Sequence, residues 1–130
     1  MEGSSGSGHT VTIDGPESIG GKNQGMRPME LMLMSVGACS SVDVISILKK
    51  SRQEVEDCIV EVEGERADAV PAVFEKIHLH FRVSGIALDE GKVVRAVELS
   101  ANRYCSASIM MKAAGVEMSH SVEVIDTKAG

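Results

Sequence analysis

The sequence predicts one α+β domain that spans all 130 residues. Three observations lead to this fold class. Alternating strand patterns lie on both sides of a long run of helix-forming residues, 43% of the residues are hydrophobic, and the chain is too short to build a second core. The predicted order is strand, helix, two strands, two helices, strand, which is typical of α+β proteins.

The first 27 residues are rich in Gly and Ser and are predicted to be mostly loop. One short alternating run, His9–Asp14, is predicted to form a strand. Residues 28–130 then carry the long helix, the paired strands and the shorter helices of the same single domain.

A helix of about six turns is predicted from Pro28 to Lys50. Proline suits the first turn, Glu30 lies near the positive end, and Lys49 and Lys50 lie near the negative end. Apolar side chains cover every side of this helix, so protein must surround it. Because one chain of this size cannot wrap a helix completely, the sequence predicts a homodimer.

Two amphipathic strands follow, at Cys58–Glu65 and Phe74–Val83. Each has one apolar face and one polar face. The polar face of the first is acidic, and that of the second carries histidine and arginine, so antiparallel pairing would place opposite charges side by side. These polar residues are Glu61, Glu63 and Glu65 on the first strand and His78, His80 and Arg82 on the second.

The last third of the chain predicts two helices and a strand. Asp89–Asn102 is amphipathic and reads as a helix. Cys105 begins or just precedes a shorter helix through Ala114, and Gly115 is a suitable residue to end it. A final alternating run, Val116–Ile125, closes the sheet.

Composition excludes several classes of function. The formal net charge is -6, and the basic residues are scattered, which argues against a nucleic-acid partner. No stretch approaches the roughly 20 apolar residues that span a bilayer, and the first residues lack a secretory signal, so we expect a cytoplasmic protein without a membrane partner. Three cysteines are too few for the disulfide framework of a small secreted domain.

Cys39 and Cys105 are the residues most suited to chemistry. Cys39 lies in the middle of the long helix among small residues, which leave space over its sulfur. Cys105 lies at a helix start, where free backbone N–H groups favour a thiolate. Either cysteine alone could equally be a packing residue, because free cysteine is often buried.

The motif Gly37-Ala38-Cys39-Ser40-Ser41-Val42-Asp43, preceded by Pro28 and followed much later by Tyr104-Cys105-Ser106, resembles the OsmC/Ohr family and its YhfA-like branch. The resemblance covers nearly the whole chain from His9. It implies an intertwined homodimer in which antiparallel sheets of both subunits enclose two long helices. Its two-cysteine arrangement is more specific than either cysteine alone.

The resemblance also implies a thiol-dependent peroxidase. Cys39 would attack an organic hydroperoxide and become a sulfenic acid, and Cys105 would condense with it to a disulfide that a dithiol then reduces. This chemistry needs no cofactor and no metal. In the peroxidase branches, an arginine and a glutamate support the attacking thiolate.

The sequence departs from the family at both supporting positions. Met29 stands where the family's glutamate is expected, and Glu30 is one place late, on the opposite side of a straight helix from Cys39. Arg27 is the nearest candidate for the arginine, and it could equally be a solvated loop charge. Glu30 could equally serve only the positive end of the helix.

Two further readings therefore remain open. One is a dimer of the same fold without peroxidase activity, which binds a small apolar molecule or senses thiol oxidation. The other is a metal site at His78 and His80, which is remote because a zinc site needs three or four ligands. Cys58, next to acidic residues at a strand start, is predicted to be inert.

Overall fold

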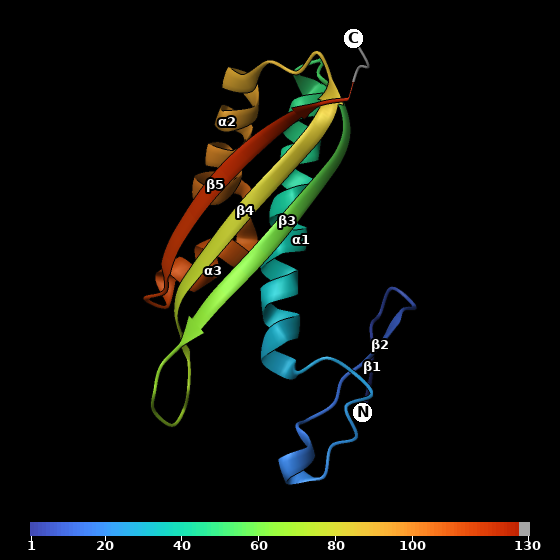
Figure 1. Ribbon diagram of the computed structural model, residues 1–130, viewed down its shortest axis with the longest axis vertical. Coiled ribbons are helices and arrows are strands. Elements are labelled where there is room, and N and C mark those ends of the chain that lie inside the picture. Colours follow the sequence, from blue (N-terminus) through green and yellow to red (C-terminus); the bar gives the residue numbers. More distant parts are fainter. Residues whose placement is uncertain (128–130) are drawn as a thin grey trace. The chain divides into compact units, whose positions relative to one another are not determined.

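The computed structural model describes residues 1–127 (Figure 1). They form two compact units, Met1–Met34 and the part that begins at Ser35. The elements in chain order are β1 (Glu2–Ser4), β2 (Thr10–Thr12), a 3₁₀ turn (Glu17–Ile19), α1 (Pro28–Lys50), β3 (Glu54–Arg66), β4 (Phe74–Ile86), α2 (Glu90–Leu99), a π-helical turn (Ser100–Tyr104), α3 (Ser106–Ala113) and β5 (Glu117–Asp126).

The N-terminal unit contains a small hairpin and a loop held by one carboxylate. Strand β2 lies within the predicted strand, and it pairs antiparallel with β1, which the sequence did not indicate. The carboxylate of Asp14 accepts hydrogen bonds from the backbone N–H groups of Lys22 at 2.9 Å and Gln24 at 3.2 Å. These bonds lower the pKa of Asp14, because they stabilise its ionised form.

Helix α1 has the predicted bounds, Pro28–Lys50. Its start is fixed locally, because the carboxylate of Glu30 accepts a 2.7 Å hydrogen bond from the backbone N–H of Arg27. The expectation that no stretch approaches membrane-spanning length was wrong, since α1 is long and apolar enough to cross a bilayer. That property is weak evidence for a span, because core helices of globular proteins share it.

The second unit is built on a three-stranded sheet in the order β3-β4-β5. Strands β3 and β4 pair antiparallel, so the predicted contact between an acidic row and a His/Arg row is confirmed. Glu61 lies opposite His80, Glu63 lies opposite His78, and Arg82 forms an ion pair with Glu61.

Strand β5 pairs with β4 in parallel, so the sheet is mixed rather than purely antiparallel. The physical reason is the connection between the two strands. The chain leaves one end of β4 and returns through α2, the π-helical turn and α3 to the other end of the sheet, which is the connection that parallel neighbours require.

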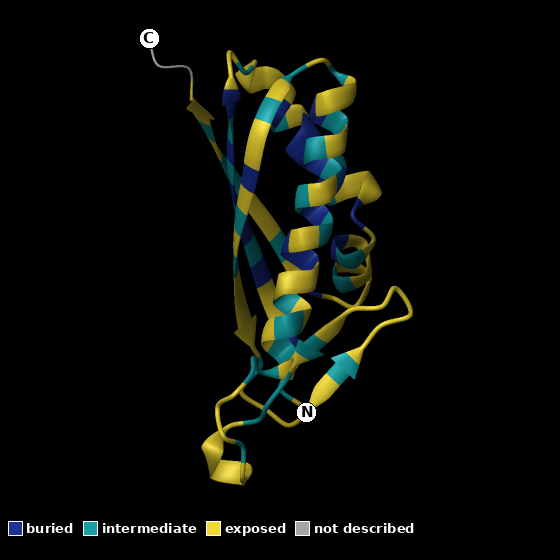
Figure 2. Cartoon of the chain, turned by 90° about the vertical axis from the view of Figure 1, so that its right-hand side faces the viewer, coloured by how far each residue is buried: buried dark blue, intermediate teal, exposed yellow. Residues whose placement is uncertain are grey.

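All three helices of this unit cover the same face of the sheet (Figure 2). The predicted inward residues of β4 are all buried there, and the helices contribute the facing side chains. Core residues with at most 4% exposure are Val36, Val44 and Leu48 of α1, Ile77, Leu79, Phe81 and Val83 of β4, and Val93, Ala96 and Val97 of α2.

Gly37 sets how closely α1 approaches the sheet. It is buried, and a Cβ atom added there would lie 2.7 Å from a methyl group of Val62 on β3. Real Cβ atoms essentially never come that close to another atom, so the helix can pack this tightly only with glycine at this position. Gly37 lies two residues before Cys39 and thereby fixes the height of the cysteine above the sheet.

We expect Gly37→Ala to lower the free energy of unfolding by up to about 2 kcal/mol. Overpacking costs about 1–3 kcal/mol, which outweighs the roughly 1 kcal/mol that alanine gains over glycine within a helix. Urea unfolding followed by circular dichroism measures the change. Adding Val62→Ala should recover part of the loss, and a purely additive double mutant would show that this contact is not the cause.

Candidate functional site

The two candidate cysteines come together in the second unit. Cys39 is presented by the middle of α1, and Cys105 is the residue that caps the start of α3. The sulfur atoms of Cys39 and Cys105 and a carboxylate oxygen of Asp43 all lie within 4.8 Å of one another. The structure thus brings together the two cysteines that the sequence singled out.

The position of Cys105 depends on a change from α-helix to π-helix in the preceding segment. The predicted helix ends as an α-helix at Leu99, and the chain continues in a π-helical turn as far as Tyr104. The backbone N–H of Cys105 donates to the carbonyl of Ser100 at 2.8 Å, and its extended backbone ends that turn. The Cys105 side chain then points back toward α1 and is fully buried.

Two serines hold the Cys105 sulfur. The hydroxyl of Ser40 donates to Cys105 Sγ at 3.2 Å, and the backbone N–H of Ser108 donates to it at 3.4 Å. The two serine hydroxyls are also 3.4 Å apart. Ser40 comes from α1 and Ser108 from α3, so this sulfur joins the two helices.

These bonds affect how readily Cys105 ionises. Burial by itself opposes ionisation of the thiol, but the hydrogen bonds from Ser108 and Ser40 outweigh it and lower the pKa of Cys105. The position of Cys105 at the start of α3 acts in the same direction, because the positive end of a helix dipole favours an anion. Cys105 is therefore the thiol that ionises more readily.

Cys39 shows the opposite behaviour. Burial raises the pKa of Cys39, and the neighbouring Cys105 and Asp43 add to this effect, while a hydrogen bond from the backbone N–H of Ala107 partly offsets it. Cys39 is also less buried than Cys105. The pair thus consists of a more accessible thiol with a raised pKa and a buried thiol with a lowered pKa.

Asp43 lies one helical turn after Cys39 and is positioned by Ser100. The Ser100 hydroxyl is fully buried between α1 and the π-helical turn, and it contacts the backbone carbonyl of Ser40 at 3.3 Å and Asp43 Oδ2 at 3.5 Å. An open cleft of about 440 Å³ adjoins Asp43 and Tyr104. The carboxylate therefore has access to solvent on one side.

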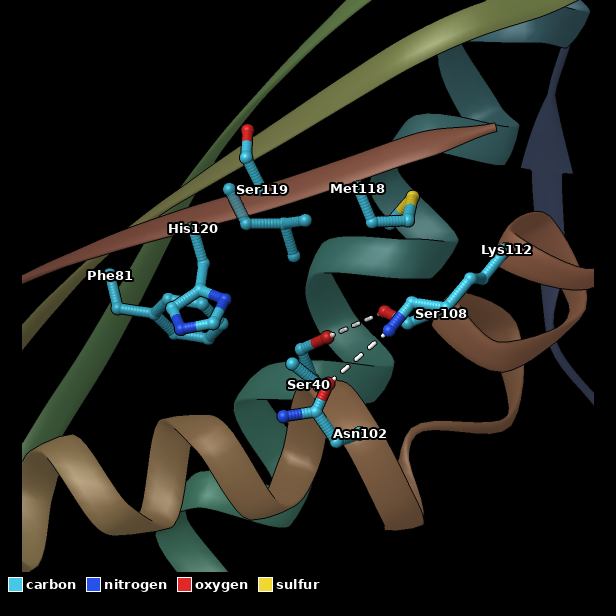
Figure 3. A pocket seen from close by; sticks show the side chains of 10 residues that line it. Ser40, Phe81, Asn102, Ser108, Lys112, Met118, Ser119 and His120 are labelled. Atoms are coloured by element: carbon cyan, nitrogen blue, oxygen red, sulfur yellow. Dashed lines mark hydrogen bonds between the residues drawn. The ribbon is translucent and has the colours of Figure 1, made fainter. Parts of the chain in front are cut away.

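Ser40 and Ser108 also line a smaller pocket of about 80 Å³ (Figure 3). Its walls include Phe81 and Met118, and the Lys112 ammonium donates to the side-chain oxygen of Asn102 at its edge at 3.2 Å. Ligand sites for drug-sized molecules are about 300–1,000 Å³, so this pocket suits only a few water molecules.

Arg27 and Glu30 have local structural roles in the N-terminal unit. The guanidinium of Arg27 donates to the side-chain oxygen of Asn23 at 3.2 Å and to the carbonyl of Gly25 at 3.4 Å. Glu30 caps the start of α1 through the Arg27 backbone N–H. These contacts agree with the alternative in which Arg27 is a loop charge and Glu30 is a carboxylate at the positive end of the helix.

The other sequence candidates have protein partners that account for them. His78 lies 2.7 Å from the hydroxyl of Ser119, and His80 lies 2.7 Å from that of Ser121, on the polar face of the sheet. Cys58 is buried at 8% exposure, and burial raises its pKa, although the hydroxyl of Ser41 partly offsets this. Within residues 1–127, neither histidine belongs to a group of three metal-ligating side chains.

Sequence reasoning missed the buried serines Ser100 and Ser108. Both are fully or almost fully buried, where an unpaired hydroxyl would be costly. The usable signal was the presence of serine on the apolar side of each predicted helix. Ser40 was noted only as one of several small residues around Cys39.

Comparison with known proteins agrees with this geometry. Residues 21–121 match the family model described as OsmC-like protein. The chain is 45% identical to Protein YhfA of Escherichia coli K12 over 123 residues, which cover 95% of this chain and 88% of that protein.

Two solved structures extend the comparison. A hypothetical protein from Aquifex aeolicus is 34% identical, with a TM-score of 0.75 over 93% of this chain and 85% of that one. An organic hydroperoxide resistance protein OsmC from Legionella pneumophila is 17% identical and shares the fold, with a TM-score of 0.68 over 93% of this chain and 87% of that one. The present chain belongs to the family of OsmC-like proteins.

Proposed function

We propose that this protein is a thiol-dependent peroxidase that reduces organic hydroperoxides through Cys39 and Cys105. The observation that supports it most is the proximity, within 4.8 Å, of a more accessible thiol and a buried thiol whose pKa is lowered. Closing this gap to the roughly 2.05 Å of a disulfide requires a movement of less than about 3 Å.

The reaction follows from this asymmetry. The thiolate form of Cys39 attacks the distal oxygen of the hydroperoxide, the O–O bond breaks, and the alkoxide leaves and takes up a proton to become an alcohol. The sulfur is now a sulfenic acid. Cys105 attacks it as a thiolate, the S–S bond forms, and hydroxide leaves as water after protonation. A dithiol reductant then restores both thiols by exchange.

The hydrogen bonds at Cys105 support its role as the second nucleophile. The hydrogen bonds from Ser40 and Ser108 stabilise the thiolate form in which Cys105 attacks the sulfenic acid. The same bonds stabilise Cys105 as a leaving group, so a dithiol attacks the accessible sulfur of Cys39 and expels Cys105.

Family resemblance supports the substrate class. The Legionella relative of the same fold is described as an organic hydroperoxide resistance protein and a predicted redox protein. We carry this description to the present chain because it retains both cysteines in a geometry that allows them to bond.

We further propose that the active form is a cytoplasmic homodimer. The outward side of α1 carries apolar residues that the protomer leaves uncovered, and Val42 is 66% exposed (Figure 2). Ala38 and Ile45 lie on the same side of the helix, at spacings of four and three residues from Val42. A second copy would bury this surface.

Sensing of thiol oxidation is a second candidate function. Asp43 favours it, because a carboxylate beside Cys39 disfavours the reactive thiolate and slows turnover. A sensor needs only a single oxidation event with a lasting disulfide, whereas a peroxidase needs rapid repetition. Both functions use the same two cysteines.

Treatment of the reduced protein with tert-butyl hydroperoxide should form a disulfide between Cys39 and Cys105, while Cys58 stays free. Peptide mapping by mass spectrometry identifies the bond. The matched control Cys58→Ser should form the same disulfide, and Cys105→Ser should stop at a sulfenic acid on Cys39. A disulfide that involves Cys58, or an unmodified Cys39, would overturn the proposal.

Oxidation of Cys39 should be slow at pH 7 and accelerate toward alkaline pH. Burial raises the pKa of Cys39, so its thiolate fraction grows about tenfold for each pH unit until the pH reaches that pKa. Stopped-flow measurement of sulfenic acid formation in Cys105→Ser gives the profile. Arg27→Met should leave it unchanged, because the Arg27 guanidinium is bound within its own loop. A rate that is high and flat near neutrality and falls in Arg27→Met would instead assign the missing positive group to Arg27.

Replacement of Val42 by lysine should abolish the dimer and lower the stability of the fold. An unpaired charge in a buried interface costs several kcal/mol, which is a large fraction of the roughly 5–15 kcal/mol that stabilises a folded domain. Light scattering at micromolar concentration measures the mass. The control Val70→Lys changes a fully exposed residue of the β3–β4 loop and should leave the dimer intact. A stable monomeric wild-type protein would refute the assembly.

A further inference from the structure

We propose that Cys39, Asp43 and Cys105 form a binding site for a thiophilic divalent cation of the zinc class in the reduced protein. We further propose that oxidation of the two cysteines to a disulfide releases this cation. The first statement is independent of the peroxidase, and the second rests on the proposed formation of the disulfide.

The arrangement of the ligand atoms supports this site. Cys39 and Asp43 are four residues apart on α1 and therefore project from the same side of the helix, one turn apart. Cys105 completes the group from the start of α3, and the three ligand atoms lie within 4.8 Å of one another. In a tetrahedral zinc site, with Zn–S near 2.3 Å and Zn–O near 2.0–2.2 Å, neighbouring ligand atoms are roughly 3.5 Å apart. Small side-chain movements are enough to reach that geometry.

Each ligand also has a hydrogen-bond donor that orients it. Cys105 Sγ accepts from the Ser40 hydroxyl and the Ser108 backbone N–H. The Asp43 carboxylate accepts from the Ser100 hydroxyl, and the Cys39 sulfur accepts from the Ala107 backbone N–H. Such outer contacts fix the ligands of protein metal sites and typically change metal affinity about 10–100-fold when removed.

The peroxidase reaction gives Asp43 no role, whereas its negative charge suits it to be a ligand for a cation. Two thiolates and a carboxylate bring three negative charges together, which is unfavourable unless a cation offsets them. The Asp43 carboxylate lies within 4.8 Å of both sulfurs and would add a third ligand atom to a complex with a divalent cation. The donor set selects the metal, because thiolates bind zinc and its relatives far better than they bind magnesium or calcium.

Solvent can reach the carboxylate side of this site. The open cleft of about 440 Å³ is lined by Asp43, though by neither cysteine. Three protein ligands with one open position are typical of catalytic zinc sites, whereas closed structural sites have four protein ligands. A cation held in this way can leave when its ligands change.

Release follows from the stoichiometry of oxidation. One organic hydroperoxide takes two electrons from the two thiolates and gives an alcohol, water and one disulfide, with protons supplied by the solvent. The disulfide sulfurs are neutral and no longer bind zinc, so only the carboxylate remains as a ligand. We therefore expect one cation released for each disulfide formed.

Metal titration of the reduced, full-length protein tests the site. Isothermal titration with Zn²⁺ should give one cation per chain, and Co²⁺ should show thiolate-to-metal charge-transfer absorption. Asp43→Asn should weaken the affinity at least about tenfold, on the scale of a lost ligand contact. This variant keeps a hydrogen-bond acceptor for Ser100, and circular dichroism checks that it folds. The control Cys58→Ser should bind like the wild type.

Three results would overturn the proposal. They are the absence of saturable binding, binding of equal affinity in Asp43→Asn, and Co²⁺ binding without the charge-transfer absorption. Protection of Cys39 from alkylation by Zn²⁺, but not by Mg²⁺, is expected in the wild type and provides a second measurement that does not depend on any variant.

A release assay separates this proposal from the peroxidase. Addition of tert-butyl hydroperoxide to the zinc-loaded protein should liberate one Zn²⁺ per disulfide, detected with a colorimetric chelator. Zinc binding without any disulfide would support the metal site and refute the peroxidase and the release step. A disulfide in a protein that binds no zinc would refute the metal site and leave the peroxidase standing.

Discussion

The contact between Ser40 of α1 and the sulfur of Cys105 connects the parts of this structure on which the site depends. Its 3.2 Å hydrogen bond joins the central helix to the start of α3, and both of its side chains are buried. A buried polar group is stable only when its partner is in place. The need to keep this hydrogen bond therefore links the position of α1, which carries Cys39, to that of α3, which Cys105 caps.

This linkage explains why the two thiols differ. The atoms that orient Cys105 also stabilise its anion, whereas Cys39 gains one backbone N–H and faces the carboxylate of Asp43. A symmetric pair of thiols would have no preferred direction of attack. The asymmetry comes from packing, because buried hydroxyl groups must find acceptors and the nearest acceptor is a sulfur.

Local signals were sufficient to predict some parts of the fold. Helix α1 has the predicted bounds because proline, Glu30 and the terminal lysines act within one turn of its ends. The inward face of β4 also followed from its alternation. Cys39 and Cys105 could be singled out because a recognisable motif surrounds each of them.

Other features depend on partners distant in sequence. Strand β3 begins four residues before Cys58. These residues lack a clear alternating pattern, and they form a strand because they pair with the end of β4. The parallel direction of β5 follows from the path of the chain through two helices. Ser100 and Ser108 lie on the apolar sides of their predicted helices, but their hydrogen-bond partners exist only because α1 packs beside them.

The burial of Cys105 has a consequence for damage. A sulfenic acid at Cys39 can react with a second peroxide to give a sulfinic acid, which most cells cannot repair. Cys105 competes with that reaction at a fixed separation of less than 4.8 Å, independent of peroxide concentration, and solvent cannot consume it first because it is fully buried. The burial of Cys105 thus protects Cys39 from oxidation beyond the sulfenic acid.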